Sequence, residues 1–342
     1  MRAPAPRRPP VPGPSAPRRV STGALPDPEH VLELLSSAHE RIRHVDDGTL
    51  ADYIPALAEA PPGAFGACVA GVGGSVVSVG DARTEFSIQS VSKPFVFALV
   101  CEAVGHDVAR ERLGANSTGL PFDSVMAIEL SEDRTLNPMV NAGAIATTSM
   151  VPGATAEQRW QFVLEGLSAF AGRELVVDRE VLDSEMATNL RNQGIAHLMD
   201  SYGHIDTDPD DATELYTKQC SLSVNAEDLA VMGATLADGG VNPVTGVRVV
   251  DPDVCTRVLA LLATAGMYEL SGDWLYDVGL PGKSGVSGGM VTIAPGKGGL
   301  GTWSPLLDAA GNSVRGQLLT HEMSVGLGLN LFASAPAREP RS

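Results

Sequence analysis

The pattern of apolar and polar residues along the chain predicts one continuous domain that begins near residue 27. Residues 29–43 carry apolar side chains at helical spacing, which predicts a helix with one buried face. Small and β-branched residues run from 66 to 81 around a Gly-Val-Gly-Gly turn, which predicts a β-hairpin. The segment FSIQ at 86–89 then leads into FVFALV at 95–100, an apolar run that predicts a buried helix.

The rest of the chain predicts a run of helices and then a return to strands. Helices are expected at 137–150, 155–171, 178–200, 225–237 and 251–264. Strand character returns in GMVTIAPG and GLGTWSPLLDAAGNS, followed by a final helix near 315–331. Strands at both ends of the chain, with a helical insert at about 105–250, imply one sheet completed by distant segments. This is an α+β arrangement and not a series of βαβ units.

The two ends of the chain differ from the domain in composition. The first nineteen residues contain seven prolines and five arginines and no acid, which predicts a disordered tail over residues 1–26. Residues 335–342 have a similar composition. The folded domain is therefore expected to span residues 27–334.

Charge narrows the classes of partner. Lysine and arginine number 24 against 41 aspartates and glutamates, a net charge of -17, which opposes binding to nucleic acid or to an anionic membrane. A small or zwitterionic ligand is the more plausible partner. No apolar run is long enough to span a bilayer, and the arginine-rich start lacks the apolar core of a secretory signal. A cytoplasmic location is therefore expected.

The cysteines and histidines lack the spacing typical of metal sites and catalytic triads. Four cysteines in apolar stretches are expected to be reduced: Cys68, Cys101, Cys220 and Cys255. Three histidines without metal or triad spacing are expected to be structural: His197, His204 and His321. The glycine-rich stretch 296–299 lacks the form of a phosphate-binding loop. No metal or cofactor is expected.

A polar cluster at the start of the buried helix suggests catalysis. If Ser90 lies at the N-cap or in the first turn, Lys93 lies over the same helix face, and Pro94 fixes the helix start nearby. Burial and the helix dipole both lower the pKa of such a lysine, so that its neutral amine can take the serine proton. This is the Ser-x-x-Lys arrangement of serine acyl-enzymes. Taken alone, the pattern is more often a serine cap followed by a surface lysine.

A second element supports the catalytic interpretation. Lys283, Ser284 and Gly285 precede a strand-like segment and match the Lys-[Ser/Thr]-Gly element that lines the opposite wall of penicillin-recognising hydrolases. Taken alone, they are equally a glycine-rich turn. The third element of those enzymes, Ser-Asp-Asn, is absent. Ser223-Val224-Asn225 imitates it, but Asn225 is better explained as a helix N-cap, because Ala-Glu-Asp follows it.

Six motifs in order resemble the serine-dependent glutaminases: QSVSKP, NPMVNAGAI, SEMATNLRNQGIAHLM, LYTKQCSL, GMYELSGDWLYDVGLPGKSGVSGG and WSPLLDAAGNS. The resemblance covers about residues 27–332. It implies a β-lactamase/transpeptidase-like fold, with an antiparallel sheet flanked by helices and a helical lobe. It also implies hydrolysis of L-glutamine to L-glutamate and ammonia without metal or organic cofactor, by a homo-oligomer, either a dimer or a tetramer. The proline-arginine extension has no counterpart whose role can be carried over.

The resemblance also implies roles for individual residues. Ser90 is the expected nucleophile and Lys93 its base. Further substrate contacts are expected at Tyr53, Asn141, Glu185, Asn192, Tyr216, Tyr268 and Val286. Glu185 suits the substrate ammonium, and the backbone N–H groups of Ser90 and Val286 suit an oxyanion hole. Either Tyr268 or Tyr216 is expected to pass a proton to the departing ammonia. Without the resemblance, such side chains are more often caps, surface acids or core aromatics.

Two other functions compete with this one. A β-lactam-recognising serine hydrolase would need the missing Ser-x-Asn element and a location outside the cytoplasm. A non-catalytic protein on the same fold would not need Ser90 and Lys93, and both are intact. Release of ammonia from glutamine would distinguish the first prediction from both alternatives.

Overall fold

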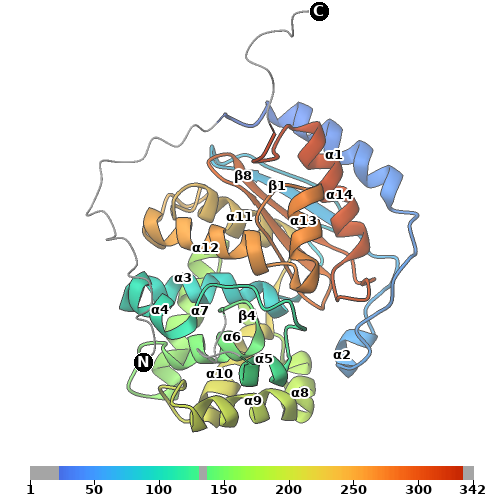
Figure 1. Ribbon diagram of the computed structural model, residues 1–342. Helices are drawn as coiled ribbons and strands as arrows, with labels where there is room; N and C mark the ends of the chain where they lie inside the picture. The colour runs from blue at the N-terminus through green and yellow to red at the C-terminus, as the bar shows by residue number, and fades with distance from the viewer. Residues whose placement is uncertain (1–22, 131–136, 334–342) are drawn as a thin grey trace, which may run out of the picture.

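The computed structural model describes residues 23–130 and 137–333. Most of the predicted N-terminal tail, and the whole of the predicted C-terminal tail, lie outside these residues. Figure 1 shows a twisted sheet with its covering helices in one half of the molecule and a cluster of helices in the other. The predicted α+β fold, an antiparallel sheet flanked by helices with a helical lobe, is confirmed.

Distant parts of the chain build the main sheet, as predicted. Its five strands lie in the order β2-β1-β8-β7-β6, and each neighbouring pair is antiparallel. The strands are β1 (Gly66–Gly71), β2 (Val76–Gly80), β6 (Gly282–Ser284), β7 (Gly289–Ala294) and β8 (Gly298–Trp303). The predicted hairpin is β1 and β2, and β8 from the C-terminal part pairs with the other edge of β1.

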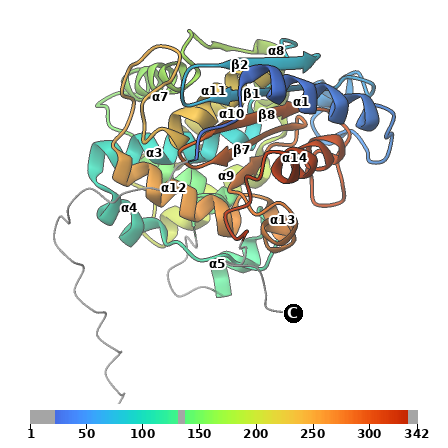
Figure 2. The ribbon, with the colours of Figure 1, turned by 90° about the horizontal axis from the view of Figure 1, so that it is seen from above.

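Alternation along β1 places helices on both faces of this sheet. Ala67 and Val69 pack with α1 (Pro28–Ile42) and α14 (Val314–Gly326), which lie side by side in Figure 2. Cys68 and Ala70 point the other way and pack with α11 (Ala226–Ala237). The chain therefore closes one face of the sheet with its two terminal helices.

The glycines of β8 allow α11 to approach the sheet closely. A Cβ atom at Gly299 would lie 2.3 Å from the Ala230 carbonyl oxygen, and one at Gly301 would lie 2.1 Å from that of Ala226. Only glycine fits such contacts. The glycine-rich sequence near 296–301 thus has a packing role, which explains its composition without a phosphate ligand.

The other half of the molecule is helical and holds the largest apolar cluster. Its helices are α3 (Ser92–Val104), α4 (His106–Leu113), α5 (Val125–Leu130), α6 (Asn141–Ser149), α7 (Ala156–Ala171), α8 (Arg179–Thr188), α9 (Leu190–Ser201), α10 (Pro209–Cys220) and α12 (Pro252–Ala265). The predicted insert boundaries at about 105 and 250 stay a prediction. One helix of that insert, α11, covers the sheet and also packs against α7 of the helical half.

Short elements complete the fold. A small antiparallel sheet has the order β3-β5-β4. The short elements are α2 (Pro55–Ala58), β3 (Phe86–Ser87), the 3₁₀ turn η1 (Gln89–Val91), β4 (Val176–Val177), β5 (Leu222–Val224), the 3₁₀ turn η2 (Tyr268–Leu270) and α13 (Ser271–Asp277). Two of them, η1 and η2, carry candidate catalytic residues.

Some predicted helices differ from the observed ones. The single helix expected at 178–200 is wrong, because the chain breaks at Asn189 between α8 and α9. The Asn189 amide donates to Thr217 Oγ1 on α10 at 3.3 Å and its carbonyl accepts from Gln193, so a tertiary contact favours the break. The helix expected from 137 begins only at Asn141.

Helix α10 was not predicted, and the final helix was predicted too long. Asp208 caps α10 by accepting from the N–H groups of Asp210 and Asp211, with Pro209 at the first position. Helix α14 ends at Gly326, five residues before the expected end at 331.

The four cysteines are buried and free, as predicted. Within residues 23–130 and 137–333, no cluster of three or more histidine, cysteine or acidic side chains is placed to hold a metal ion. No helix in the same part of the chain is long and apolar enough to cross a membrane.

Candidate active site

Ser90 lies in a strained turn between the small sheet and α3. Residue Gln89 before it has φ of 51°, in the left-handed region that non-glycine residues rarely adopt. The prediction that Ser90 starts the long helix needs correction, because Ser90 belongs to η1 and Val91 is the N-cap of α3. The backbone bond from Ile88 N–H to the Leu222 carbonyl holds the turn against β5. Pro94 is the third residue of α3, within the first helical turn as predicted.

Lys93 is a buried amine directed at α6. Its side chain is 1% exposed, and Nζ donates to Asn141 Oδ1 at 2.7 Å and to the Met139 carbonyl at 3.3 Å. Aromatic rings surround the amine, with the Phe122 centroid at 5.7 Å and the Tyr216 centroid at 5.8 Å. Burial lowers the pKa of Lys93 to about 8. A large fraction of the amine is therefore neutral near pH 8, as a general base requires.

Asn141 connects three other predicted site residues. Its Oδ1 accepts from Lys93 and from the Tyr216 hydroxyl, the latter at 3.3 Å, and its Nδ2 donates to Asn192 Oδ1 at 3.0 Å. These residues come from α3, α6, α9 and α10. One amide at the start of α6 thus ties the candidate base to the side chains that line the cavity.

Glu185 and Gln89 form a second contact at the turn. The Gln89 amide donates to Glu185 Oε1 at 2.5 Å and to Ser87 Oγ at 3.1 Å. Burial raises the pKa of Glu185 to about 7, and the Gln89 hydrogen bond opposes this rise. A cationic ligand group beside Glu185 would favour the ionised carboxylate. The same bond holds the side chain of the strained residue next to Ser90.

The Lys-Ser-Gly element lies beside this turn. A Cβ atom at Gly285 would lie 3.0 Å from the Ile88 carbonyl oxygen and 3.2 Å from Gln89 Cβ. This contact brings the β6–β7 turn, and with it Val286, next to η1. In the described part of the chain, no acceptor is found for the Val286 N–H. A free N–H group at this place suits an oxyanion.

Tyr268, on η2, lies close to both Ser90 and the Lys-Ser-Gly element. It has φ of 54°, and its hydroxyl donates to the Ser284 carbonyl at 3.0 Å. Burial raises the pKa of Tyr268, and the nearby Ser90 hydroxyl opposes this rise. Tyr268 therefore lies beside the candidate nucleophile and stays protonated over the physiological range.

Lys283 adds a second buried amine. Its Nζ donates to the Ser284 carbonyl at 2.7 Å and lies 4.2 Å from the centroid of the Tyr268 ring. Burial lowers the pKa of Lys283 strongly, and the Lys93 charge lowers it further. Two amines that repel each other's protonated form share this site.

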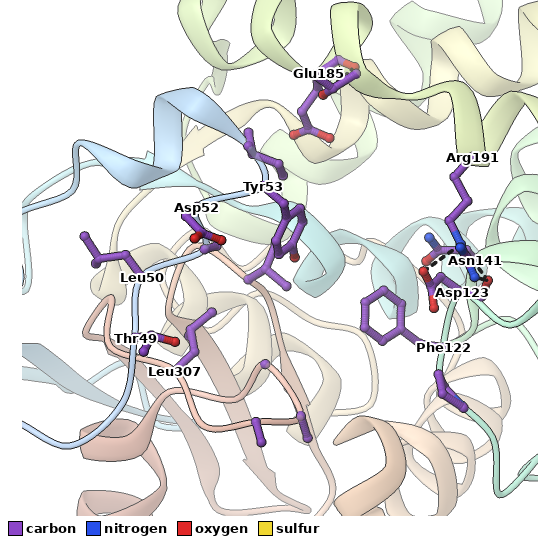
Figure 3. Close-up of a pocket in the computed structure, with 18 of the residues that line it drawn as sticks. Thr49, Leu50, Asp52, Tyr53, Phe122, Asp123, Asn141, Glu185, Arg191 and Leu307 are labelled. Carbon is purple, nitrogen blue, oxygen red and sulfur yellow. Dashed lines mark hydrogen bonds and ion pairs between the residues drawn. The ribbon is translucent and has the colours of Figure 1, made fainter.

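A cavity of about 750 Å³ opens above these groups. Its lining includes five predicted site residues: Tyr53, Asn141, Glu185, Asn192 and Val286. Figure 3 shows the Tyr53 ring reaching into the cavity between Glu185 and the wall formed by Phe122 and Asn141. The other four predicted residues are buried: Ser90, Lys93, Tyr216 and Tyr268. The structure thus brings all nine predicted residues to one place.

Several charged residues that line this cavity are not predicted by the sequence. Its lining contains five acids and one arginine: Asp52, Asp123, Glu185, Glu269, Asp308 and Arg191. Arg191 pairs with Asp123 at 2.7 Å, so the remaining excess of acids favours a ligand that carries a positive group. Gln89 was also missed, although its place next to Ser90 in QSVSKP was a signal.

Asn225 is a helix cap, as predicted. Its side chain accepts from the Asp228 N–H, and the Asp228 carboxylate accepts from the Asn225 N–H, which is a capping box for α11. Ser223 hydrogen-bonds to Glu85 at 2.9 Å. This segment therefore does not supply the Ser-x-Asn element that a β-lactam hydrolase would need.

Comparisons with known protein sequences find one family. The sequence model of the family described as Glutaminase matches residues 48–332. Glutaminase 2 of Yersinia pestis is 58% identical over 320 residues, which is 94% of this chain and 94% of that protein.

Solved structures give the same result. A structure described as the probable glutaminase ybaS superposes with a TM-score of 0.89 at 42% identity, over 90% of this chain and 100% of the other. The Bacillus subtilis glutaminase YbgJ superposes with a TM-score of 0.78 at 29% identity, over 89% of this chain and 99% of the other. That structure is a covalent complex with 5-oxo-L-norleucine, formed by reaction with 6-diazo-5-oxo-L-norleucine.

Proposed function

The chain belongs to the glutaminase family and hydrolyses L-glutamine to L-glutamate and ammonia, and we propose that the reaction passes through an acyl-enzyme on Ser90. The observation that carries this proposal is the buried amine of Lys93, whose pKa is lowered to about 8. Lys93 follows Ser90 by three residues, and the Ser90 hydroxyl lies beside Tyr268. The covalent complex of the Bacillus subtilis relative supports it.

In the acylation step, Lys93 takes the Ser90 proton as Oγ attacks the γ-carbonyl carbon of glutamine. The carbonyl oxygen becomes an oxyanion, which the N–H groups of Ser90 and Val286 stabilise. As the C–N bond breaks, Tyr268 gives its proton to the leaving nitrogen and is reprotonated at the expense of the Lys93 ammonium. Ammonia leaves, and the γ-glutamyl ester of Ser90 remains.

In the second step, water attacks the ester carbonyl and Lys93 takes its proton. The C–O bond to Ser90 breaks, Oγ recovers a proton, and glutamate leaves. Substrate contacts are assigned by charge. The substrate ammonium pairs with Glu185. The amide of Asn192 and the hydroxyl of Tyr53 bind the substrate carboxylate. The cavity's excess of acids supports the first assignment.

Labelling tests the acyl-enzyme directly. The compound 6-diazo-5-oxo-L-norleucine carries a diazomethyl ketone where glutamine has its amide. The diazo carbon takes up a proton, Ser90 Oγ then attacks it, and N₂ leaves, so that a stable ether adduct of 5-oxo-L-norleucine remains. We expect peptide mass spectrometry to find the adduct on Ser90 in the parent and no adduct in Ser90→Ala. Ammonia release from glutamine, with asparagine as the comparison substrate, is measured on the same samples. An adduct on another residue, with Ser90 unmodified, would contradict the proposal.

The pH dependence of the reaction follows from the raised pKa of Glu185 and the lowered pKa of Lys93. Glu185, with a pKa of about 7, must lose its proton to pair with the substrate, and Lys93, with a pKa of about 8, must lose its proton to act as base. Both requirements make kcat/KM rise with pH. We expect an increase from pH 6 to pH 9 with two ionisations, of which Glu185→Gln removes the lower one. A rate that falls steadily over this range would contradict both assignments.

The remaining expectations rest on the resemblance. We propose that the chain acts as a dimer or tetramer and that it works in the cytoplasm. Neither of the competing functions gains support, because the Ser-x-Asn segment is a helix cap and the relatives are named glutaminases.

A further inference from the structure

A buried arginine outside the catalytic cluster contacts both ends of a chain segment whose middle part lines the cavity. Arg315, the second residue of α14, is 4% exposed. Burial lowers its pKa, and the charge of Asp46 opposes this effect. In the part of the chain that the structure describes, its hydrogen-bond acceptors are neutral oxygens. A buried guanidinium held mainly by backbone carbonyls is unusual, since buried charges generally pair with an opposite charge.

These acceptors lie at the two ends of one segment. Nε donates to the Val45 carbonyl at 2.6 Å, while Nη1 donates to the carbonyls of Pro62 at 3.0 Å and Ala64 at 3.3 Å. Val45 follows α1 and Ala64 precedes β1. One side chain therefore joins the two ends of residues 45–64, which we call the 45–64 loop. A further bond from Nη1 reaches Ser304 Oγ at 3.4 Å, just after β8.

The 45–64 loop forms part of the cavity wall. Residues 49–54 line the cavity, and Figure 3 shows Thr49, Leu50, Asp52 and Tyr53 along one side of it. Two backbone bonds of 2.9 Å between Thr49 and Leu307 join this loop to a neighbouring lining segment, residues 307–311. The middle of the loop, α2, contacts α8 through a hydrogen bond from Ala56 N–H to Ser184 Oγ at 3.4 Å.

We propose that Arg315 is a positioning residue that sets the path of the 45–64 loop and thereby holds Tyr53 against the bound substrate. This inference rests on the proposed placement of glutamine in the cavity. The planar guanidinium presents donors in a fixed fork, so it reaches both ends of the loop at once, whereas a lysine amine is a single point. Arg315 has no described contact with Ser90, Lys93 or Tyr268, so its effect falls on substrate binding and not on chemistry.

The first test is Arg315→Lys, which keeps the charge but loses the fork. We expect KM for glutamine to rise about tenfold while kcat changes less than about threefold. Hydrogen exchange should accelerate in the 45–64 loop and stay unchanged in β7 and β8. The matched control is Arg41→Lys, because Arg41 also joins α1 to α14, through Glu322, but on the surface. Its KM should equal that of the parent.

The second test is coupling between Arg315 and Tyr53. If the arginine acts through the position of Tyr53, then Arg315→Lys should raise KM less than about threefold in a Tyr53→Ala background. A merely structural arginine would lower the melting temperature and leave KM unchanged. An unchanged KM in Arg315→Lys, or the same tenfold rise in both backgrounds, would overturn the inference.

A second variant keeps the test valid if Arg315→Lys does not fold. Gly48 has φ of 104°, and a Cβ atom there would lie 2.7 Å from the Leu307 carbonyl oxygen. Gly48→Ala therefore displaces the same loop from its attachment to Leu307. It should raise KM in the parent background and raise it less in a Tyr53→Ala background. An unchanged KM in this variant would also overturn the inference. Failure of the proposed function is seen separately, as a parent in which Ser90 is not labelled.

Discussion

Ser90→Ala and Lys93→Ala are each expected to lower kcat for glutamine by about 10⁴-fold or more, because nucleophile and base act as one chemical unit. The serine variant has no oxygen to acylate. The lysine variant leaves the hydroxyl without a proton acceptor, and it also leaves Asn141 Oδ1 without its 2.7 Å donor. Lys93→Met keeps most of the buried volume and should lose activity equally. Steady-state ammonia release measures all three, with circular dichroism to verify the fold.

Two control variants make the same substitutions away from the cavity, one at a buried serine and one at a partly exposed lysine. Ser324 is a buried serine on α14 whose hydroxyl donates to the Val278 carbonyl at 2.7 Å. Lys297 lies in the turn before β8. Ser324→Ala and Lys297→Ala make the same chemical changes away from the cavity, and each should keep kcat within about twofold. An alanine at residue 90 or 93 with a rate near that of the parent would rule out the acyl-enzyme proposal.

The sequence predicted those elements whose pattern is local. Apolar periodicity located α1 and α11 closely, and alternation located the β1–β2 hairpin. These elements follow from side chains that repeat along a few turns, so neighbouring residues contain the information. Pairing of β1 with β8 was also predictable in outline, because strand-like segments at both ends of one domain must share a sheet.

Features that depend on distant contacts were not predictable in the same way. Periodicity continues through Asn189, yet the chain breaks there because Thr217 offers a hydrogen bond from another helix. The left-handed backbone of Gln89 and Tyr268 is likewise imposed by packing, since neither residue type favours it. The role of Arg315 depends on Val45 and Ala64, both more than 200 positions away in the sequence.

The candidate site shows the same division. Ser90, Lys93 and the Lys-Ser-Gly element were recognisable from short motifs, and the substrate contacts only from the resemblance. The hydrogen bonds that join them, such as Asn141 to Lys93 and Asn141 to Tyr216, required coordinates. The sequence did not decide whether Tyr216 or Tyr268 passes the proton. The hydrogen bonds distinguish the two, because the Tyr216 hydroxyl donates to Asn141 and the Tyr268 hydroxyl to the Ser284 carbonyl.

Tyr268→Phe is expected to lower kcat by about 10²- to 10⁴-fold, the usual contribution of a general acid. Its hydroxyl lies beside Ser90, and burial raises its pKa, so it holds a proton where the leaving nitrogen needs one. Tyr216→Phe is the matched control, because it removes the same atom. The Tyr216 hydroxyl donates to Asn141 Oδ1 at 3.3 Å and so supports the base and the cavity wall. We expect it to raise KM with less than about a tenfold loss of kcat.

A comparison of an amide with a thioester substrate identifies the step in which Tyr268 acts. The γ-methyl thioester of glutamate releases a thiolate that needs no proton, so Tyr268→Phe should acylate with it at nearly the parental rate while remaining slow with glutamine. Single-turnover release of the thiol measures this step apart from deacylation. If Tyr268→Phe loses equal activity on both substrates, the hydroxyl serves the geometry of Ser90 and not the leaving group. If Tyr216→Phe alone shows the amide-specific loss, the proton passes through Tyr216 instead.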